Sequence, residues 1–244
     1  MMDELNIDDI LRDWPYDPNS VSVRLAKGSD ERDILQMRIE MGLLQLETTG
    51  RPDGEKPNDE NTYFDYLITL SFENDDFVMT EDMCSEADRE FVQFYHRRVC
   101  WLSLREFDKA VLDANHTLAL MNFCREHSPD ESWTLAREQY RPFVMFHRIQ
   151  AEALGELEDT TAEKAVEVIN RGLNELRDVF VEFEADDEFD ESELVQRLQE
   201  LRESLREKFE VGSTLREQLD AAIAAEQYEL AAELRDQLAA QGKA

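Results

Sequence analysis

The hydrophobic pattern of the chain is strand-like near the N-terminus. Apolar and polar residues alternate in Val21–Ala26, which predicts a strand. The same alternation over Leu35–Leu43 predicts a second strand and makes Met37 and Met41 core candidates. The leucines that follow either extend this strand or begin a third, before the turn residues of Thr48–Gly54. We therefore expect a small antiparallel sheet of two or three strands.

From Thr62 onwards the apolar residues recur with the period of a helix. A short helix is expected around Tyr63–Leu70. Longer amphipathic segments then predict two helical hairpins in tandem, namely about Glu86–Leu104 with Glu106–His127, and about Ser132–Leu157 with Thr161–Phe183.

The two predicted hairpins share a pattern of bulky and small residues. The residues of this pattern are Phe94, Trp101, Phe107, Ala110 and Leu118 in the first hairpin, and Ala151, Leu154, Ala165, Gly172 and Leu173 in the second. The spacing resembles that of the tetratricopeptide repeat, in which a bulky residue of one helix packs near a small residue of the next. Arg97 and Arg98 depart from it, because the repeat has leucine and a small residue there.

An acidic run follows the second hairpin. The segment Glu182–Glu193 contains eight acidic residues and no basic one, so we expect it not to pack and to serve as a linker. The next apolar residues recur at spacings of 4, 3, 4 and 4, and they are Leu194, Leu198, Leu201, Leu205 and Phe209. This pattern predicts an amphipathic, coiled-coil-like helix that ends at Gly212 and packs against a partner.

The C-terminal segment predicts two short helices that face each other. Thr214 and Glu217 have the spacing of a capping box, which starts the first helix. The apolar stripes are Leu215, Leu219, Ala222 and Ile223 in the first helix, and Tyr228, Ala231, Ala232, Leu234 and Leu238 in the second. The pattern breaks near Gln227, where Tyr228 is expected to fill the turn. Such a hairpin buries little surface alone, so its remaining apolar face should bind a partner or a second copy.

This hairpin resembles the UVR motif, which occurs in the excinuclease B and C subunits of bacterial nucleotide excision repair and in some regulators of stress kinases and proteases. The residues on its characteristic positions are Leu219, Ala222, Tyr228, Glu229, Ala231, Ala232, Leu234, Arg235 and Asp236. The resemblance implies a protein-interaction hairpin that pairs with another of its kind. The residues it assigns to partner binding are Tyr228, Ala231, Leu234, Arg235 and Asp236, with Leu219 and Ile223 opposite. Gln227 stands where the family prefers Asp or Asn.

The charge of the chain limits the classes of partner that it can bind. Asp and Glu number 57 against 26 Lys and Arg, which gives a net charge of −31 and disfavours direct binding to nucleic acid or anionic membranes. No apolar run approaches the ~18 residues of a membrane span, and the first residues lack the pattern of a signal peptide. Cys84, Cys100 and Cys124 are too widely spaced for a disulfide framework or a redox motif. We therefore expect a cytoplasmic protein with reduced thiols.

Neither the motifs nor the histidine and cysteine spacings indicate an enzyme. The sequence contains no HExxH, GxSxG, Walker or GxGxxG motif. His96 with Cys100, and Cys124 with His127, have helical metal-ligand spacings, but a hairpin folded about Arg105 would divide such ligands into two partial sets. We expect no catalytic activity, no metal and no cofactor.

The densest basic cluster of the chain lies on the first predicted hairpin. Its members are His96, Arg97, Arg98, Arg105 and Lys109. One interpretation is a basic groove that binds an acidic peptide, with Glu182–Glu193 as an intramolecular candidate, or a C-terminal carboxylate. The other is that surface arginines neutralise Glu90 and Glu106. The sequence leaves both open.

Together these patterns predict an α+β fold that is mainly helical. The expected segments are a small β element at 1–60, tandem helical hairpins at 61–183, an acidic linker and amphipathic helix at 184–212, and a UVR-like hairpin at 213–244. The expected function is a non-enzymatic adaptor that recruits a protein through the C-terminal hairpin. The alternative is an accessory factor of nucleotide excision repair that acts through an excinuclease subunit. Whether the chain also forms a homodimer is open.

Overall fold

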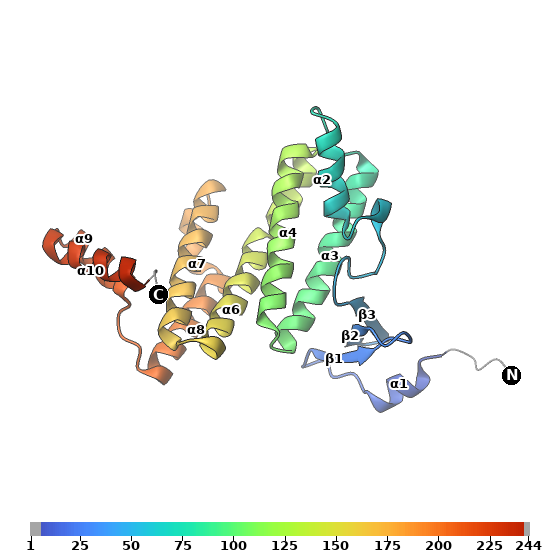
Figure 1. Cartoon of the computed structure of the whole chain (residues 1–244), viewed down its shortest axis with the longest axis horizontal. Helices are drawn as coiled ribbons and strands as arrows, with labels where there is room; N and C mark the ends of the chain where they lie inside the picture. The colour runs from blue at the N-terminus through green and yellow to red at the C-terminus, as the bar shows by residue number, and fades with distance from the viewer. Residues whose placement is uncertain (1–5, 242–244) are drawn as a thin grey trace. The chain divides into compact units, whose positions relative to one another are not determined.

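The computed structural model describes residues 6–241 and contains helices together with a three-stranded sheet (Figure 1). It divides into two compact units, residues 1–148 and 149–244. Residues 1–5 and 242–244, which belong to the predicted segments 1–60 and 213–244, lie outside the described residues. The predicted fold class, mainly helical with a small N-terminal antiparallel sheet, is confirmed.

The sheet follows a short helix, α1 (Asp8–Asp13), and has the antiparallel order β1-β2-β3. Its strands are β1 (Ser22–Lys27), β2 (Asp33–Ile39) and β3 (Gly42–Glu47). In the register of the sheet Val23 faces Met37 and Met37 faces Leu44. The leucines after residue 43 therefore belong to a third strand.

Met41 is not a core residue. Ile39 pairs directly with Gly42, so the chain reverses at residues 40 and 41, and Met41 is 90% exposed. Met37, in the middle strand, is buried as expected. The alternating pattern continued through the turn and did not reveal where the strand ends.

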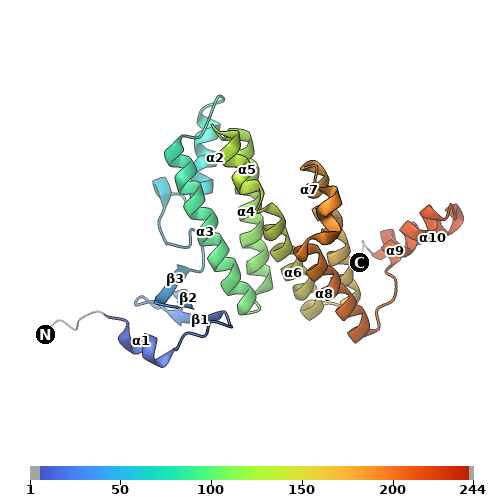
Figure 2. The ribbon, with the colours of Figure 1, turned by 180° about the vertical axis from the view of Figure 1, so that it is seen from behind.

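The first unit adds a set of helices beside this sheet (Figures 1 and 2). After a 3-10 turn at Pro57–Asp59 come α2 (Tyr63–Glu73), α3 (Glu81–Ser103), α4 (Phe107–His127), α5 (Glu131–Glu138) and α6 (Arg141–Asp159), the last of which continues into the second unit. The hairpin of α3 and α4 buries all five residues that carried the repeat-like spacing. Helix α3 begins earlier than predicted, because Thr80 caps it by accepting from the Met83 amide.

The single helix predicted over Ser132–Leu157 is wrong. The chain breaks at Gln139 and Tyr140, between α5 and α6. Pro142 explains the break, because it has no amide hydrogen to donate to Glu138 and its ring opposes a continuous helix. The helical spacing of apolar residues continues across the break, so the hydrophobic pattern alone indicated one helix.

The second unit contains residues 149–159 of α6 followed by α7 (Ala162–Glu182), a 3-10 segment η2 (Asp186–Glu191), α8 (Glu193–Phe209), α9 (Leu215–Ala224) and α10 (Tyr228–Gln241). The apolar stripe of α8 packs against α7, with Leu198 and Leu205 buried. The middle of this stripe is therefore covered by α7, whereas its last member, Phe209, is 45% exposed. Glu210, in the left-handed conformation, ends α8 in place of Gly212.

The acidic run between α7 and α8 does pack, contrary to expectation. Its segment η2 buries Phe189, which is only 2% exposed. The Phe189 ring meets Phe180 edge to face at 5.5 Å, and the guanidinium of Arg177 lies 3.9 Å from its centroid. One aromatic residue is enough to anchor the run, because a buried phenylalanine contributes about 1.5–3 kcal/mol. Its acidic neighbours stay at the surface.

Candidate functional site

The α9–α10 hairpin begins with a complete capping box. The Glu217 amide donates to Thr214 Oγ1 at 3.3 Å, and the Thr214 amide donates to Glu217 Oε2 at 2.8 Å. Thr214 itself is 1% exposed. The capping box predicted from the spacing of these two residues is confirmed, and it fixes where α9 begins.

Glu217 also ties the hairpin to the rest of the second unit. Asn170 of α7 donates to Glu217 Oε1 at 3.0 Å, and Arg206 of α8 forms an ion pair with the same oxygen. Partial burial acts to raise the pKa of Glu217, but hydrogen bonds from Thr214 and Arg206 outweigh it and hold the pKa below its ordinary value. The ionised carboxylate is therefore the form that holds the start of α9 in place.

The interior of the hairpin is a small apolar seam between its two helices. Its buried members are Leu219, Ala222, Ala231 and Leu234, with Leu215 and Leu238 packed alongside. Small alanine side chains let the helix backbones approach, and the leucines fill the remaining space. Leu219, Ala231 and Leu234, which we assigned to partner binding, thus hold the hairpin together.

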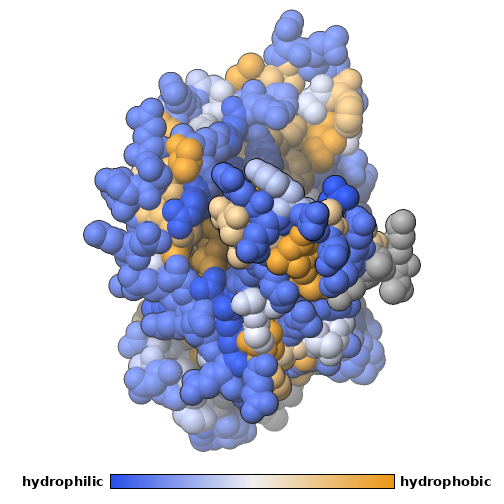
Figure 3. Space-filling view, turned by 90° about the vertical axis from the view of Figure 1, so that its left-hand side faces the viewer, coloured by the Kyte–Doolittle hydropathy of each residue, from blue (hydrophilic) through white to orange (hydrophobic). Residues whose placement is uncertain are grey.

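A second set of apolar residues lies outside this seam. Ile223 is 53% exposed, Tyr228 is 70% exposed and Leu230 is 43% exposed. Tyr228 therefore does not fill the turn, since the reversal is made by Glu226 in the left-handed conformation. Figure 3, which faces the side of α9 and α10, shows apolar groups (orange) as small separate patches in a mainly hydrophilic surface.

The polar pair of the motif is also exposed. Arg235 Nη2 and Asp236 Oδ1 lie 3.2 Å apart, and their side chains are 71% and 74% exposed. The seven predicted residues are thus divided between interior and surface, with Ile223, Tyr228, Arg235 and Asp236 on the outside. Leu230 was missed, although its position four residues before the buried Leu234 marks it as a neighbour of the seam.

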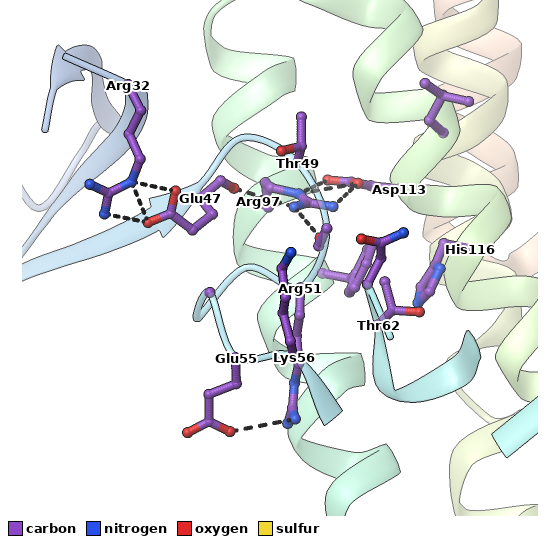
Figure 4. Close-up of a pocket in the computed structure, with 15 residues that line it drawn as sticks. Arg32, Glu47, Thr49, Arg51, Glu55, Lys56, Thr62, Arg97, Asp113 and His116 are labelled. Carbon is purple, nitrogen blue, oxygen red and sulfur yellow. Dashed lines mark hydrogen bonds and ion pairs between the residues drawn. The ribbon is translucent and has the colours of Figure 1, made fainter. Parts of the chain in front are cut away.

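The basic cluster of the first hairpin is not a surface cluster. Arg97 is 4% exposed and Arg98 is 1% exposed, so their expected surface position is wrong. Arg97 binds Asp113 through two nitrogens, with Nη2 at 2.7 Å from Oδ1, and donates from Nη1 to the Gly50 carbonyl at 2.7 Å (Figure 4). It therefore clamps the loop after β3 onto α3 and α4.

Of the other three residues of the cluster, His96 is half-buried, whereas Arg105 and Lys109 are exposed. Lys109 Nζ lies 2.9 Å from Glu106 Oε2 and 4.6 Å from the centre of the Trp101 ring. Arg105, in the left-handed conformation at the turn between α3 and α4, lies over Phe107. The structure thus separates the four Lys and Arg residues of the cluster into two internal ones, Arg97 and Arg98, and two external ones, Arg105 and Lys109.

A polar cleft of about 730 Å³ lies beside Arg97 (Figure 4). Its arginines already have carboxylate partners. Arg32 pairs with Glu47 at 2.8 Å, and Arg51 pairs with Glu86 at 2.9 Å. Buried Glu90 is similarly engaged, because it accepts from the Tyr63 amide at 2.7 Å. The arginines of the cleft therefore belong to an internal network of ion pairs and hydrogen bonds that joins the loop, α2, α3 and α4.

The three cysteines are free and buried in the first unit. Burial raises the pKa of Cys100 and of Cys124 to about 12, so both thiols stay protonated at neutral pH. Among residues 6–241 no group of three or more His, Cys, Asp or Glu side chains is arranged to hold a metal ion. Within the same residues no helix combines the length and apolar character needed to cross a membrane.

Comparison with known proteins identifies one segment of the chain. Residues 213–241 match the family model described as the UvrB/uvrC motif, which confirms the resemblance of the α9–α10 hairpin to the UVR motif. The match covers both helices and the capping box of α9. None of the curated proteins and none of the solved structures compared with the chain matches it. The hairpin is thus a UvrB/UvrC-type interaction module.

Proposed function

We propose that the protein is a non-enzymatic adaptor of the cytoplasm that binds a partner protein through the exposed face of the α9–α10 hairpin. The observation that carries this proposal is the match of residues 213–241 to the UvrB/uvrC motif. The exposure of Ile223 and Tyr228 outside the seam supports it, because exposed apolar groups on a helical hairpin suit pairing with another helical surface.

The charge of the hairpin bears on the kind of partner. Residues 213–241 contain six acidic and two basic residues, which gives a net charge of −4. Pairing two copies of this hairpin would bring like charges together, whereas a hairpin with a basic rim would be attracted. We therefore propose a different protein as the main partner and regard a homodimer as the less favoured arrangement.

The family description suggests which partner to test first. Because the motif is named for UvrB and UvrC, a UvrB- or UvrC-type protein is the first candidate. In that case the chain would serve nucleotide excision repair as an accessory factor and reach DNA through its partner, since its own net charge of −31 opposes direct contact with phosphates.

The test compares surface variants of the hairpin in the full chain. Replacing Ile223 and Tyr228 together by serine removes apolar surface but leaves the seam intact. We expect affinity for a purified UvrB-type protein, or for a partner that the full chain retains and a chain ending at Gly212 loses, to fall roughly 10- to 100-fold. The control is Phe72→Ser, which removes another exposed ring, 85% exposed, from the first unit.

An unchanged affinity in the hairpin double variant, with circular dichroism showing intact helices, would contradict the proposal. Leu234→Asp is a less useful test, because Leu234 is 5% exposed and belongs to the seam. A charge there would unfold the hairpin and abolish binding for an indirect reason.

A further inference from the structure

A second cavity, of about 870 Å³, lies within the first unit between α3, α4, α5 and the first turns of α6. Its wall is mainly apolar and aromatic, and it includes Phe91, Val92, Tyr95, Met121, Tyr140 and Phe143. A concave site of this size, with an apolar lining and few polar groups, is typical of small-molecule sites in proteins.

The unusual member of this wall is Arg98, which is 1% exposed. Its Nε lies 3.2 Å from His147 Nδ1, and its Nη1 lies 3.1 Å from Thr117 Oγ1. Both partners are neutral acceptors, and no carboxylate of residues 6–241 lies within ion-pair distance of Arg98. Arg97 and Arg141, which are also buried, pair directly with Asp113 and Glu138.

The only carboxylate whose charge acts on Arg98 among the described residues is Asp113, and both of its oxygens are already bound by Arg97. Burial lowers the pKa of Arg98 to about 10, so the guanidinium stays charged at neutral pH. Burial and the charge of Arg98 lower the pKa of His147 to about 4, so His147 is neutral and Nδ1 accepts the hydrogen bond. The other charged pair at the cavity, Asp88 with Arg137, neutralises itself, with Arg137 Nε 2.8 Å from Asp88 Oδ1.

A buried positive charge without a directly bound carboxylate is costly, and an anionic ligand would lower the cost. The aromatic wall accommodates an apolar body, and one guanidinium suits one carboxylate, with which arginine forms a planar pair of hydrogen bonds. A ligand with several negative charges is disfavoured, because the chain carries a net charge of −31.

We propose that this cavity is a binding site for a small organic monocarboxylate with an aromatic or aliphatic body, whose carboxylate pairs with Arg98. The site lies in the first unit and does not depend on the function of the α9–α10 hairpin. Its ligand would add a small-molecule input to a protein whose other feature is a protein-interaction module.

The test uses phenylbutyrate and its neutral amide, phenylbutyramide, as probes of the full chain. The signals to follow by NMR are those of the Met121 methyl group and the His147 ring, which lie at the cavity and beside Arg98. We expect the acid to bind at least ~10-fold more tightly than the amide, because only the acid pairs with the guanidinium. In Arg98→Met this preference should disappear, and in Arg98→Lys part of it should remain.

The matched control is Arg89→Met, which removes an exposed arginine from the same helix, outside the cavity. Its preference for the acid should equal that of the unchanged chain. Equal affinity for acid and amide in the unchanged chain, or a preference that survives in Arg98→Met, would overturn the proposal. If Arg98→Met does not fold, the unchanged chain decides, because bound phenylbutyrate should raise the pKa of His147 whereas bound amide should not.

A third probe separates the sources of the carboxylate. Acetylated glycylphenylalanine carries the same aromatic body and carboxylate at the end of a peptide. We expect it to bind no more tightly than phenylbutyrate. Binding that is much tighter, and lost in Arg98→Met, would reassign the cavity to a polypeptide C-terminus and overturn the small-molecule proposal.

Discussion

Gly172 of α7 lies directly against Ile149 of α6. A Cβ atom at this position would lie 2.6 Å from Cδ1 and Cγ2 of Ile149, which is shorter than any ordinary contact. Both residues are buried, so neither can move into solvent. We expect Gly172→Ala to lower the free energy of unfolding of the second unit by about 1–3 kcal/mol, as overpacked cores do. Urea denaturation followed by circular dichroism measures the change.

The matched test of this steric explanation is a double variant. Ile149→Ala alone should lower the free energy of unfolding of the second unit, because it leaves a cavity. In that background Gly172→Ala should lower it little further, because the new methyl group occupies the vacated space. If Gly172→Ala lowers the free energy of unfolding equally with isoleucine and with alanine at position 149, the close approach to Ile149 is not the cause of the destabilisation.

Buried arginines mark the limit of what the sequence predicts at single positions. The sequence showed that Arg97 and Arg98 interrupt an apolar pattern, but it could not show that Asp113, Thr117 and His147 come from other elements to meet them. A charged residue can be buried only when such partners are present. In the hairpin the apolar stripes correctly placed Leu219 and Leu234 between the two helices. The same stripes did not distinguish the residues of the seam from those of the exposed face.

At the scale of elements, Glu217 links the start of α9 to α7 and α8 through Asn170 and Arg206. Its pKa is lowered in the folded state, so the stability it contributes is present above its ordinary value of 4.5 and is lost as the pH falls through the lower, folded value. We expect Glu217→Gln to increase amide hydrogen exchange in α9 at pH 7, equivalent to a loss of about 1 kcal/mol.

The control for this prediction is Glu207→Gln, which neutralises an exposed glutamate of α8. The difference in exchange between the unchanged chain and Glu217→Gln should shrink as the pH falls below the ordinary value of 4.5, because the protonated carboxyl no longer stabilises α9. A difference that stays constant throughout an acid titration would show that the ionised carboxylate is not what holds the helix.

Most elements follow from local sequence, and the exceptions have local causes. The strands, the helices α2, α3, α4 and α7 and the capping box at Thr214 agree with alternation, helical period and spacing. The break before Pro142 was missed because the apolar period continues across it. The packing of η2 was not predicted, because the excess of acidic residues in the run indicated a solvated linker, although the single ring of Phe189 is enough to anchor it.

At the scale of the whole molecule, the net charge of −31 should shape association with the proposed partner. If a basic rim of the partner meets the acidic hairpin, affinity should weaken as salt rises from about 0.05 to 0.5 M, because ions screen the attraction. Self-association of the chain should not weaken as salt rises, since salt screens the repulsion between two acidic copies. Binding measured by titration calorimetry, and sedimentation of the chain alone, check both expectations.

Two variants with the same net charge separate local from global electrostatics. Replacing Glu229 and Glu233 of α10 by lysine, or Asp75 and Asp76 after α2 by lysine, changes the net charge by the same amount. We expect the α10 variant to lose roughly 10-fold in affinity and much of its salt dependence, because those charges flank the binding face. The other variant should change little, since at physiological salt the field of a surface charge decays within about 8 Å. Equal losses in both variants would mean that the overall charge, rather than the charge of the hairpin, attracts the partner.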